Sequence, residues 1–454
     1  MSLSSLPCRA RLMRSLTVTA LAGVLASCGG GPHVGHKHRP VTPETGNRIP
    51  ILTQVEMGAH VDDSIASVAV VVPPAVENDA WAQPGGAANK SYGNLAIADV
   101  PKRAWTIFVP GATERRRLAS APVIGGGELF VMDALGVLHT FDAVTGAPKW
   151  THSFDVQGED ELAVFGGGAS YDAGRVYITT GLGQVAALDA VSGKLLWQVK
   201  PAGPLRGAPT VAFGSVFVTT QNNEIHALNA DDGTAIWDES ASLGEAGVFG
   251  VAAPAAGQGT VIAGYSTGEL IAYRYENGRT LWSDALARTS LSTRVGVLTD
   301  IDADPIIDHG RVYALGQGGR MAAYELVSGQ RIWELNVAGI STPAVAGDWI
   351  FTLTDDAKLL CIARSSGKVR WITQLDRFHN QRKKSGASLY WTGPVLAGDR
   401  LWIANNEGEI ATMNISDGTV KKFADLGSPI SLAPVVAKST LYVMSDDGRI
   451  VAFR

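Results

Sequence analysis

Three histidines near the N-terminus are the residues whose spacing comes closest to that of a metal site. His33, His36 and His38 lie within one short stretch, and a neutral imidazole is a common metal ligand. Residues 29–50 around them are rich in glycine, proline and polar side chains, a composition typical of a flexible tether. Nothing nearby completes a rigid site with the further ligands that a metal needs. We therefore interpret these histidines as part of a solvated linker and predict no metal site.

The cysteines and hydroxyl groups do not indicate catalysis either. Cys361 lies within the apolar stretch KLLCIA, where a lone cysteine behaves as a small buried apolar residue. Serines, histidines and aspartates are scattered through turn-like stretches, in which such side chains usually bond to the backbone. No set of nucleophile, base and orienting group stands out. The sequence therefore predicts no catalytic residue, no cofactor and no enzymatic activity.

A repeated pattern of glycine and tryptophan dominates the sequence instead. In the copy GQVAALDAVSGKLLW, Gly193 follows Gly183 by ten residues and Trp197 follows Gly193 by four. The second glycine recurs at Gly146, Gly193, Gly233, Gly278, Gly329, Gly367 and Gly418, and a tryptophan follows it in every copy but the last, where Lys422 stands. A period of about 40 to 50 residues is the signature of a propeller or array.

Each copy of the pattern predicts two β-strands joined by a tight turn. The stretch QVAALDA is apolar or small on both faces, as expected of a strand that is covered on both sides. The following DAVSG supplies an aspartate and a glycine for a hairpin turn. KLLW then begins the next strand, and its tryptophan offers a large flat surface to a neighbouring sheet.

The number of half-repeats predicts how the ring closes. A second pattern, such as APTVAFGSVFVTT, occurs eight times, against seven copies of the glycine–tryptophan pattern. The stretch KRAWTIFV near the start is a strand without a partner, and its Trp105 lies one repeat before Trp150. We predict that this strand completes the last sheet, because closure leaves no long exposed edge. The predicted fold is all-β: an eight-bladed β-propeller of four-stranded antiparallel blades over residues 79–454, with 79–97 as an irregular lead-in.

The N-terminus has the features of a lipoprotein signal. Three arginines precede the apolar stretch SLTVTALAGVLA, which is too short to cross a membrane as a stable helix. The stretch that follows, LASC from Leu25 to Cys28, resembles the bacterial lipobox. This resemblance implies that residues 1–27 are a signal peptide and that Cys28 is the lipidated first residue of the mature protein. The alternative is an ordinary secretory signal with an incidental cysteine.

Two further expectations follow from this signal. Gly29 rather than an aspartate follows Cys28, which favours sorting to the outer membrane, with the protein lipid-anchored at its periplasmic face. Residues 28–78 are then a lipidated flexible tether and lead-in.

Removal of residues 1–27 takes away three arginines and no acidic residue, so the formal net charge changes from −5 to −8. An acidic chain of this kind gives no basis for binding nucleic acid.

The repeat resembles that of the pyrroloquinoline-quinone dehydrogenases, which occurs in quinoprotein enzymes and in non-catalytic propellers. The resemblance rests on the stretch ALDAVSGKLLW and its copies. The enzymes of that group have two adjacent cysteines beside the quinone and a calcium site with a catalytic aspartate. This chain has no adjacent cysteines, and its length leaves little room for the loops that build those sites. The resemblance therefore favours the non-catalytic branch.

Within that branch the chain resembles the BamB family, the scaffold lipoproteins of the machinery that inserts β-barrels into the bacterial outer membrane. The resemblance extends from RIPIL to VAFR, and two loops make it specific: LRGAPTVAFG and LTDIDADP. In that family these loops form much of the surface that meets BamA, the barrel-forming insertase. The resemblance thus implies a BamA-like insertase and its complex as partners, together with nascent outer-membrane proteins.

Four residues of this chain match the partner-binding positions of that family. They are Leu205 and Arg206 in the first loop, and Asp300 and Asp302 in the second. The family has a further leucine two positions before Leu205, where this chain has Gly203. An alternative interpretation is that Arg206 pairs with an acid in its own ring and that the aspartates cap turns.

A second candidate contact surface and two other function classes stay open. Residues 376–391, DRFHNQRKKSGASLYW, carry four basic residues, which fits a solvated loop, or a loop that meets an acidic partner or lipid headgroups. A propeller with another role in the envelope, such as sensing or cell-wall binding, is the first alternative to the scaffold. A quinoprotein dehydrogenase is the second and the less favoured one.

Overall fold

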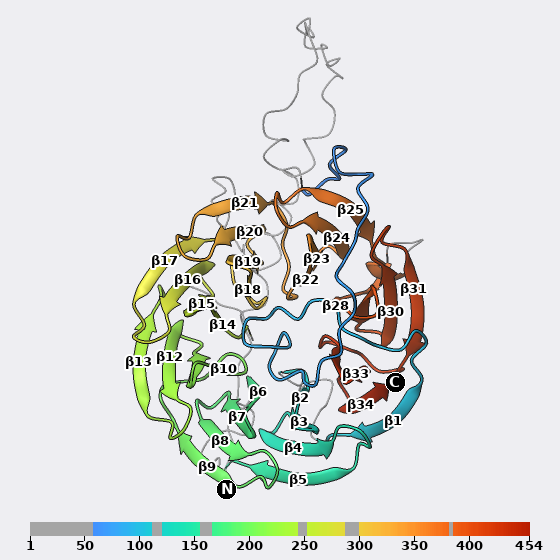
Figure 1. The fold of residues 1–454 in the computed structure, drawn as a ribbon. Coiled ribbons are helices and arrows are strands. Elements are labelled where there is room, and N and C mark those ends of the chain that lie inside the picture. Colours follow the sequence, from blue (N-terminus) through green and yellow to red (C-terminus); the bar gives the residue numbers. More distant parts are fainter. Residues whose placement is uncertain (1–57, 111–119, 155–165, 244–251, 287–298, 381–384) are drawn as a thin grey trace, which may run out of the picture. The chain divides into compact units, whose positions relative to one another are not determined.

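The computed structural model describes residues 58–110, 120–154, 166–243, 252–286, 299–380 and 385–454. These residues form β-strands, turns and irregular segments, and none of them lies in a helix. Eight four-stranded antiparallel sheets follow one another around a ring (Figure 1). The predicted all-β, eight-bladed propeller is therefore confirmed.

Each of the first four blades takes its strands in chain order. Blade 1 contains β2 (Val123–Gly125), β3 (Glu128–Met132), β4 (Val137–Asp142) and β5 (Pro148–Ser153), and blade 2 contains β6 (Gly167–Asp172), β7 (Arg175–Thr180), β8 (Val185–Asp189) and β9 (Leu195–Val199). Blade 3 contains β10 (Thr210–Ala212), β11 (Ser215–Thr219), β12 (Glu224–Asn229) and β13 (Ala235–Ser240), and blade 4 contains β14 (Ala255–Gly257), β15 (Thr260–Gly264), β16 (Glu269–Arg274) and β17 (Thr280–Ala285).

The next three blades follow the same order, with one hairpin inserted. Blade 5 contains β18 (Ile306–Asp308), β19 (Arg311–Gly316), β20 (Arg320–Glu325) and β21 (Arg331–Leu335), and blade 6 contains β22 (Ala344–Ala346), β23 (Trp349–Leu353), β24 (Lys358–Ala363) and β25 (Val369–Gln374). The hairpin of β26 (Phe378–Asn380) and β27 (Ser385–Ser388) precedes blade 7, which contains β28 (Trp391–Leu396), β29 (Arg400–Asn405), β30 (Glu409–Asn414) and β31 (Val420–Asp425).

Blade 8 joins the two ends of the described chain. Its strands β32 (Val435–Ala437), β33 (Thr440–Met444) and β34 (Arg449–Phe453) are completed by β1 (Arg103–Phe108). Strand β1 runs antiparallel to β34, with Trp105 opposite Ala452 and Ile107 opposite Ile450. The predicted closure of the ring by an N-terminal strand is confirmed.

The repeated tryptophans pack one blade onto the next. Trp197 lies on the outermost strand of blade 2, and a methyl group at Gly233 of blade 3 would lie 2.6 Å from its Cε3 atom. Its indole Nε1 also donates a hydrogen bond of 3.0 Å to the carbonyl of Ala230 in the same turn. The same pair of contacts, to a turn glycine and to a nearby carbonyl, is made by Trp105, Trp150, Trp237, Trp282, Trp333 and Trp371.

This contact explains why the last copy of the pattern lacks its tryptophan. Lys422 lies on β31, the outermost strand of blade 7, where it pairs with Ala411 of β30 and has 55 % of its side chain exposed. In the other blades the glycine lies in the turn between the third and fourth strands. The fourth strand of blade 8 is β1, which does not follow β34 in the chain, so the described residues of that blade form no such turn for an indole to cover. Phe423, next to Lys422, instead contacts Trp402 and Phe453 edge-on, with ring centroids 5.0 and 5.2 Å apart.

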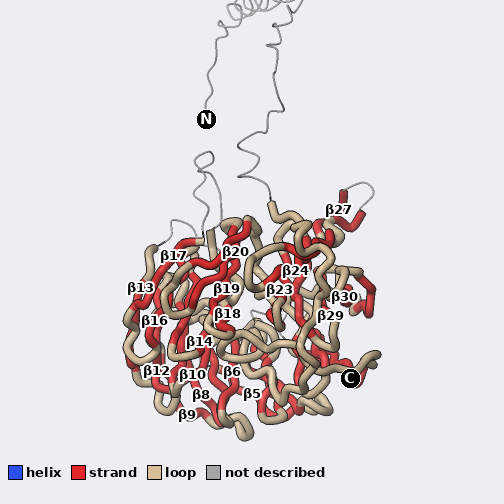
Figure 2. Tube along the Cα trace, turned by 45° about the horizontal axis from the view of Figure 1, so that its top comes forward, coloured by secondary structure: helices blue, strands red, loops and turns tan. Residues whose placement is uncertain are grey.

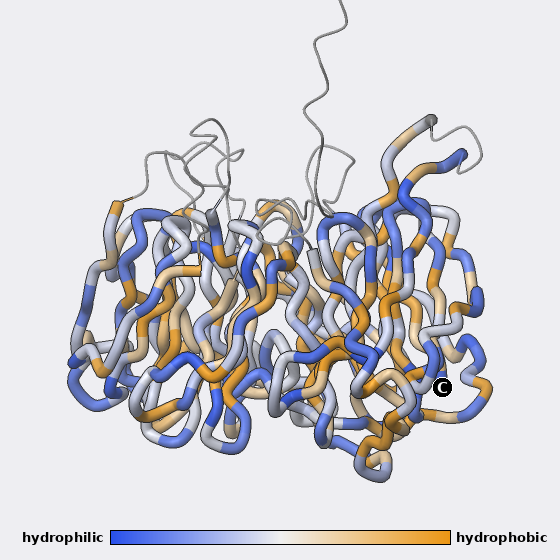
Figure 3. Tube along the Cα trace, turned by 90° about the horizontal axis from the view of Figure 1, so that it is seen from above, coloured by the Kyte–Doolittle hydropathy of each residue, from blue (hydrophilic) through white to orange (hydrophobic). Residues whose placement is uncertain are grey.

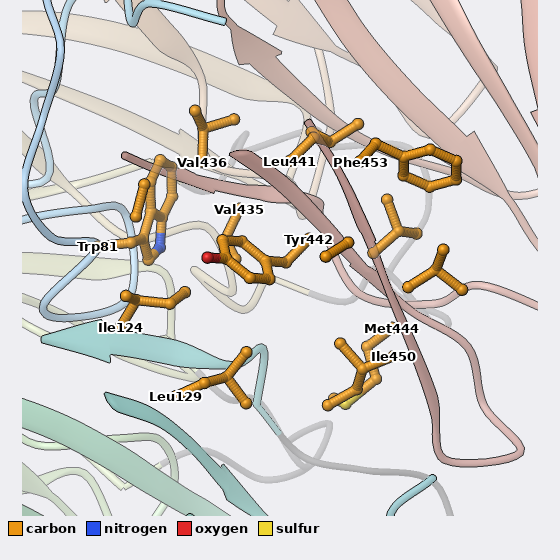
Figure 4. Packing of buried hydrophobic residues seen from close by; sticks show 14 of the residues in the cluster. Trp81, Ile124, Leu129, Val435, Val436, Leu441, Tyr442, Met444, Ile450 and Phe453 are labelled. Carbon is orange, nitrogen blue, oxygen red and sulfur yellow. The ribbon is translucent and has the colours of Figure 1, made fainter. Parts of the chain in front are cut away.

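The hydrophobic core is divided into clusters that lie mainly between neighbouring blades. Figure 3 shows the ring from the side, with apolar stretches along the inner strands and turns on two opposite faces. The largest cluster joins blades 7, 8 and 1 and includes Ile124, Leu129, Trp402 and Tyr442, all with 2 % of their surface exposed or less. Figure 4 shows Trp81 among these side chains, facing Ile124 and Val435. The N-terminal segment is thus part of the core.

Residues 58–97, which we call the axial segment, run along blade 6 and then across the centre of the ring, in blue in Figure 1. The segment is irregular, but it is hydrogen-bonded to the backbone of every blade. Its own backbone bonds to seven blades and the side chain of Gln83 bonds to the eighth, at Val211. The partners in the order of the blades are Ile124, Tyr171, Val211, Ala256, Ile307, Val369, Leu396 and Lys438. The sequence placed residues 79–97 on the ring, and the structure adds residues 58–78 to this packed segment.

Candidate functional site

The loop that contains Arg206 is held by its own backbone on the way into blade 3. The amide of Arg206 donates to the carbonyl of Thr219 at 2.9 Å, and its carbonyl accepts from the amide of Gly167 in blade 2 at 3.0 Å. Leu205 forms an isolated bridge with Thr220 and is fully buried in the cluster between blades 2 and 3. These contacts fix where the Arg206 side chain begins.

The loop that contains Asp300 enters blade 5 and is fixed in the same way. The carbonyl of Asp300 accepts from the amide of Gln317 at 2.9 Å, and the amide of Ile301 donates to the carbonyl of Tyr265 in blade 4 at 3.2 Å. Ile301 is fully buried in the cluster between blades 4 and 5. Both loops connect the outermost strand of one blade to the innermost strand of the next, so in a ring of antiparallel blades they open on one face. We call it the connection face, defined by residues 200–209, 299–305 and their equivalents.

Arg206 and Asp300 form a buried ion pair across blade 4. The Nη2 atom of Arg206 lies 2.7 Å from Oδ1 of Asp300, and each side chain has 1 % of its surface exposed. Asp302 stands beside the pair, with Oδ1 3.4 Å from the same Nη2 and 11 % of its side chain exposed. Nε and Nη1 of Arg206 and Oδ2 of Asp300 are buried without a hydrogen-bond partner among the described residues.

The structure therefore brings together all four residues that the family resemblance singled out, and it pairs them with one another. The alternative interpretation, that Arg206 pairs with an acid in its own ring, describes the observed geometry. Leu205, Arg206 and Asp300 are buried and Asp302 is partly exposed, so in this structure Asp302 is the member of the set that a partner could touch.

Two further charged residues, which the sequence did not single out, lie next to this cluster. Lys90 of the axial segment has 1 % of its surface exposed, and its Nζ lies 3.2 Å from Oγ1 of Thr210. Asp304 is also buried and accepts a hydrogen bond of 2.8 Å from the amide of Ala253. Asp304 was visible in the stretch DIDADP as a third acid at a two-residue interval, but Lys90 was not, because only the ring brings it near.

Burial shifts the pKa values of these groups in opposite directions. Burial and the negative charge of Asp300 raise the pKa of Asp302 to about 7, against the opposing effect of Arg206. Burial raises the pKa of Asp304, and the nearby Lys90 opposes that rise. Burial lowers the pKa of Lys90 to about 8, which Asp304 opposes. The cluster therefore contains groups that titrate near neutral pH.

A cavity of about 500 Å³ lies at the connection face along the axis of the ring. Its floor consists of Trp81, Pro84, Gly85 and Tyr92 of the axial segment. Its wall consists of the connections into six blades, at residues 120–122, 208, 302 and 304, 340–342, 390–395 and 430–435. Asp302 and Asp304 thus line the cavity, whereas Arg206 and Lys90 lie behind its surface.

The basic loop forms the hairpin β26–β27, which projects from the ring in Figure 2. Phe378 pairs with Ser388, and Nδ1 of His379 lies 2.6 Å from a carboxylate oxygen of Glu407 in blade 7. Tyr390 and Trp391 at its base line the cavity. Residues 381–384, with three of the four basic residues, lie outside the described part of the chain, as do Cys28 and the three histidines.

Two comparisons of the sequence with known proteins agree on one family. The sequence profile of outer membrane protein assembly factor BamB matches residues 153–373. The outer membrane protein assembly factor BamB of Salmonella typhimurium is 31% identical over 335 residues, which are 73% of this chain and 83% of that protein. This chain belongs to the BamB family.

Solved structures extend the comparison to the fold. BamB from Moraxella catarrhalis superposes with a TM-score of 0.63 at 18% identity, covering 78% of this chain and 100% of that one. A europium-containing methanol dehydrogenase superposes with a TM-score of 0.64 at 15% identity, covering 86% and 90%. At these identities the structures show the fold alone, which this chain shares with both of these proteins. Within the described residues, no helix has the length and apolar character needed to cross a membrane.

Proposed function

We propose that this protein is a non-catalytic scaffold lipoprotein in the assembly of outer membrane β-barrel proteins, and that its connection face binds a BamA-like insertase. Membership of the BamB family supports the assembly role. The observation that supports the binding face is the Arg206–Asp300 ion pair, because it ties two loops from different blades into one rigid surface. A preformed surface loses less entropy on binding than separate mobile loops do.

The four residues have different roles in this proposal. Leu205, Arg206 and Asp300 are positioning residues, since their side chains are buried and hold the loops in place. Asp302 is the contact residue, because its carboxylate lies at the edge of the cavity and is partly exposed.

The cavity is a poor fit for a quinone cofactor of the kind that the dehydrogenases bind. Pyrroloquinoline quinone carries carboxylate groups, and the acidic side chains of Asp302 and Asp304 offer them no positively charged partner. Of the described residues that line the cavity, none is a lysine, arginine or histidine. The described residues also contain no group of three His, Cys, Asp or Glu side chains placed to hold a metal ion. These side chains support a binding role for the cavity rather than a redox one.

We further propose that lipidation at Cys28 anchors the protein at the periplasmic face of the outer membrane. One acyl chain anchors only marginally, so stable attachment requires the several chains that bacterial lipoproteins carry. The variant Cys28→Ala is expected to leave the outer-membrane fraction and to change its mobility in a gel. If the variant stays in that fraction with unchanged mobility, the anchor is elsewhere.

Co-purification from detergent-solubilised outer membranes tests the binding face. Tagged wild-type protein is expected to bring down the insertase, and Asp302→Lys is expected to reduce the yield by about tenfold or more. Asp238→Lys, on the exposed outer strand of blade 3, and Lys383→Gln in the basic loop are the controls and should bind normally. Thermal unfolding of each variant shows whether it folds. If Asp302→Lys folds and still co-purifies like the wild type, this face does not bind the insertase.

A further inference from the structure

The cavity at the connection face has a closed, preformed floor. The carbonyls of Trp81 and Asn89 accept hydrogen bonds of 2.9 Å from Ile124 in blade 1 and Ile307 in blade 5. The rings of Trp81 and Tyr92 lie 4.9 Å apart, and the hydroxyl of Tyr92 donates to the carbonyl of Pro394 in blade 7. The floor is therefore attached to several blades and does not have to form when something binds.

The two sides of the cavity differ in chemistry. One side is apolar and aromatic, with Trp391, Pro394, Leu432 and Val435. The other carries the carboxylates of Asp302 and Asp304. The volume of about 500 Å³ falls within the range of about 300 to 1,000 Å³ that is usual for ligand pockets.

The acidic side of the cavity has more acidic than basic groups around it. Asp300, Asp302 and Asp304 are accompanied by two cations, Arg206 and Lys90, and both cations are almost fully buried behind the surface. A positive group that enters the cavity would therefore stabilise the ionised form of Asp302, which at a pKa of about 7 is partly protonated at neutral pH. It would bond to that carboxylate in surroundings where a charge-assisted hydrogen bond is strong. An anionic group would be repelled.

We propose that this cavity receives a projecting segment of the bound partner in which an apolar side chain stands next to a lysine or arginine. The apolar side chain packs between Trp81 and Leu432, and the cation bonds to Asp302. This inference rests on the proposed function for the origin of the segment, but the chemistry of the cavity can be tested separately. The partner must then supply an apolar side chain next to a lysine or arginine at the position that meets this cavity.

Matched peptides test the chemistry directly. The probes are fluorescently labelled, blocked tetrapeptides of sequence Leu-Phe-Lys-Leu and the same peptides with norleucine or glutamate in place of lysine. With the full mature protein, fluorescence polarisation is expected to show the lysine peptide binding at least about tenfold more tightly than the norleucine peptide. The glutamate peptide should show no saturable binding. Equal binding of the three peptides, or none, overturns the proposal.

Variants locate the binding within the cavity. Ala433→Trp fills the cavity from its wall, and Asp302→Asn removes one carboxylate. Both are expected to lower affinity for the lysine peptide at least about tenfold, and Asp302→Asn should abolish the preference for lysine over norleucine. The matched controls are Ala147→Trp in an exposed turn and Asp238→Asn on an exposed strand. If the controls lose binding as much as the cavity variants, the peptides bind elsewhere and the proposal is wrong.

Insertase binding separates this inference from the proposed function. If Ala433→Trp loses both the peptide and the insertase, the cavity receives the partner. If Ala433→Trp binds the insertase normally, the inference fails and the connection face stays a candidate. If the wild type binds the lysine peptide but not the insertase, the proposed function fails, and with it the origin of the segment in that partner. A photo-crosslinker at Ser341 in the cavity wall of the otherwise wild-type protein, followed by mass spectrometry, identifies what enters the cavity. It should mark an apolar and basic segment of the insertase only if the cavity receives the partner.

Discussion

The indole of Trp197 covers Gly233 of the next blade so closely that a methyl group at that glycine would lie 2.6 Å from the ring. The glycine has a positive φ of 75°, which residues with a Cβ rarely adopt. The glycine and the tryptophan of the repeat are therefore two halves of one contact, made between successive blades. The contact recurs around the ring and stacks each sheet on its neighbour.

The first prediction concerns this contact. Gly233→Ala is expected to lower the free energy of unfolding by about 1 to 3 kcal/mol, because the methyl group collides with the indole. Gly174→Ala is the matched control, since Gly174 also has a positive φ, of 83°, but open space around its Cβ position. The control should cost only about 1 kcal/mol for the backbone strain. Denaturant unfolding measures both, and equal losses would contradict the role of the contact.

The second prediction concerns the buried ion pair. Arg206→Ala and Asp300→Ala should each cost about 3 to 5 kcal/mol, because each leaves a buried charge without its partner. The double variant should lose less than the two single losses together, since neither Arg206 nor Asp300 is then left buried without the other. Lys422→Ala, which removes an exposed pair with Asp425, should cost less than about 1 kcal/mol. Strictly additive losses at Arg206 and Asp300 would show that the two side chains are not coupled.

The third prediction concerns pH. The folded-state pKa of Asp302, about 7, is above its ordinary value of 3.8, so folding favours the protonated form. Its contribution to stability is complete below about pH 4 and is lost as the pH rises to about 7. Asp300, Asp355 and Arg206 are the charged groups that act on it, and Asp302→Asn removes the titration while keeping the shape.

Urea unfolding at several pH values checks this expectation. Relative to the wild type, Asp302→Asn should become more stable as the pH rises from 4 to 8. Asp238→Asn, at an exposed position, should show no such trend. A constant difference between Asp302→Asn and the wild type over this range would mean that Asp302 titrates normally.

The fourth prediction concerns ring closure. Deletion of all residues up to Val109 removes β1 and the axial segment, and it exposes the edge of β34, so the protein should aggregate. Deletion of residues 29–45 leaves both in place and should not affect folding. Solubility and thermal unfolding compare the two. If both truncated proteins are equally soluble and melt alike, β1 is not needed to close the ring.

Much of the fold was predictable because its determinants repeat within short stretches of chain. Strand, turn and strand are encoded in each copy, as in residues 183–197, and eight copies of the half-repeat set the number of blades. The absence of a tryptophan at position 422 was visible but not explained, since its cause is the blade completed by β1. Trp105 could be assigned to the last blade only because its spacing from Trp150 matches the repeat.

The sequence by itself thus determined the blades, because antiparallel strands that are neighbours in sequence pair through local turns and a repeating apolar pattern. It also pointed to Arg206, Asp300 and Asp302, through a family resemblance. Only the tertiary structure decided what these residues do, since the pair spans 94 positions of sequence and forms when the ring brings two loops together across blade 4. The same holds for Lys90 beside Asp304 and for the floor of the cavity. Their neighbours are set by the closure of the ring, to which no local pattern refers.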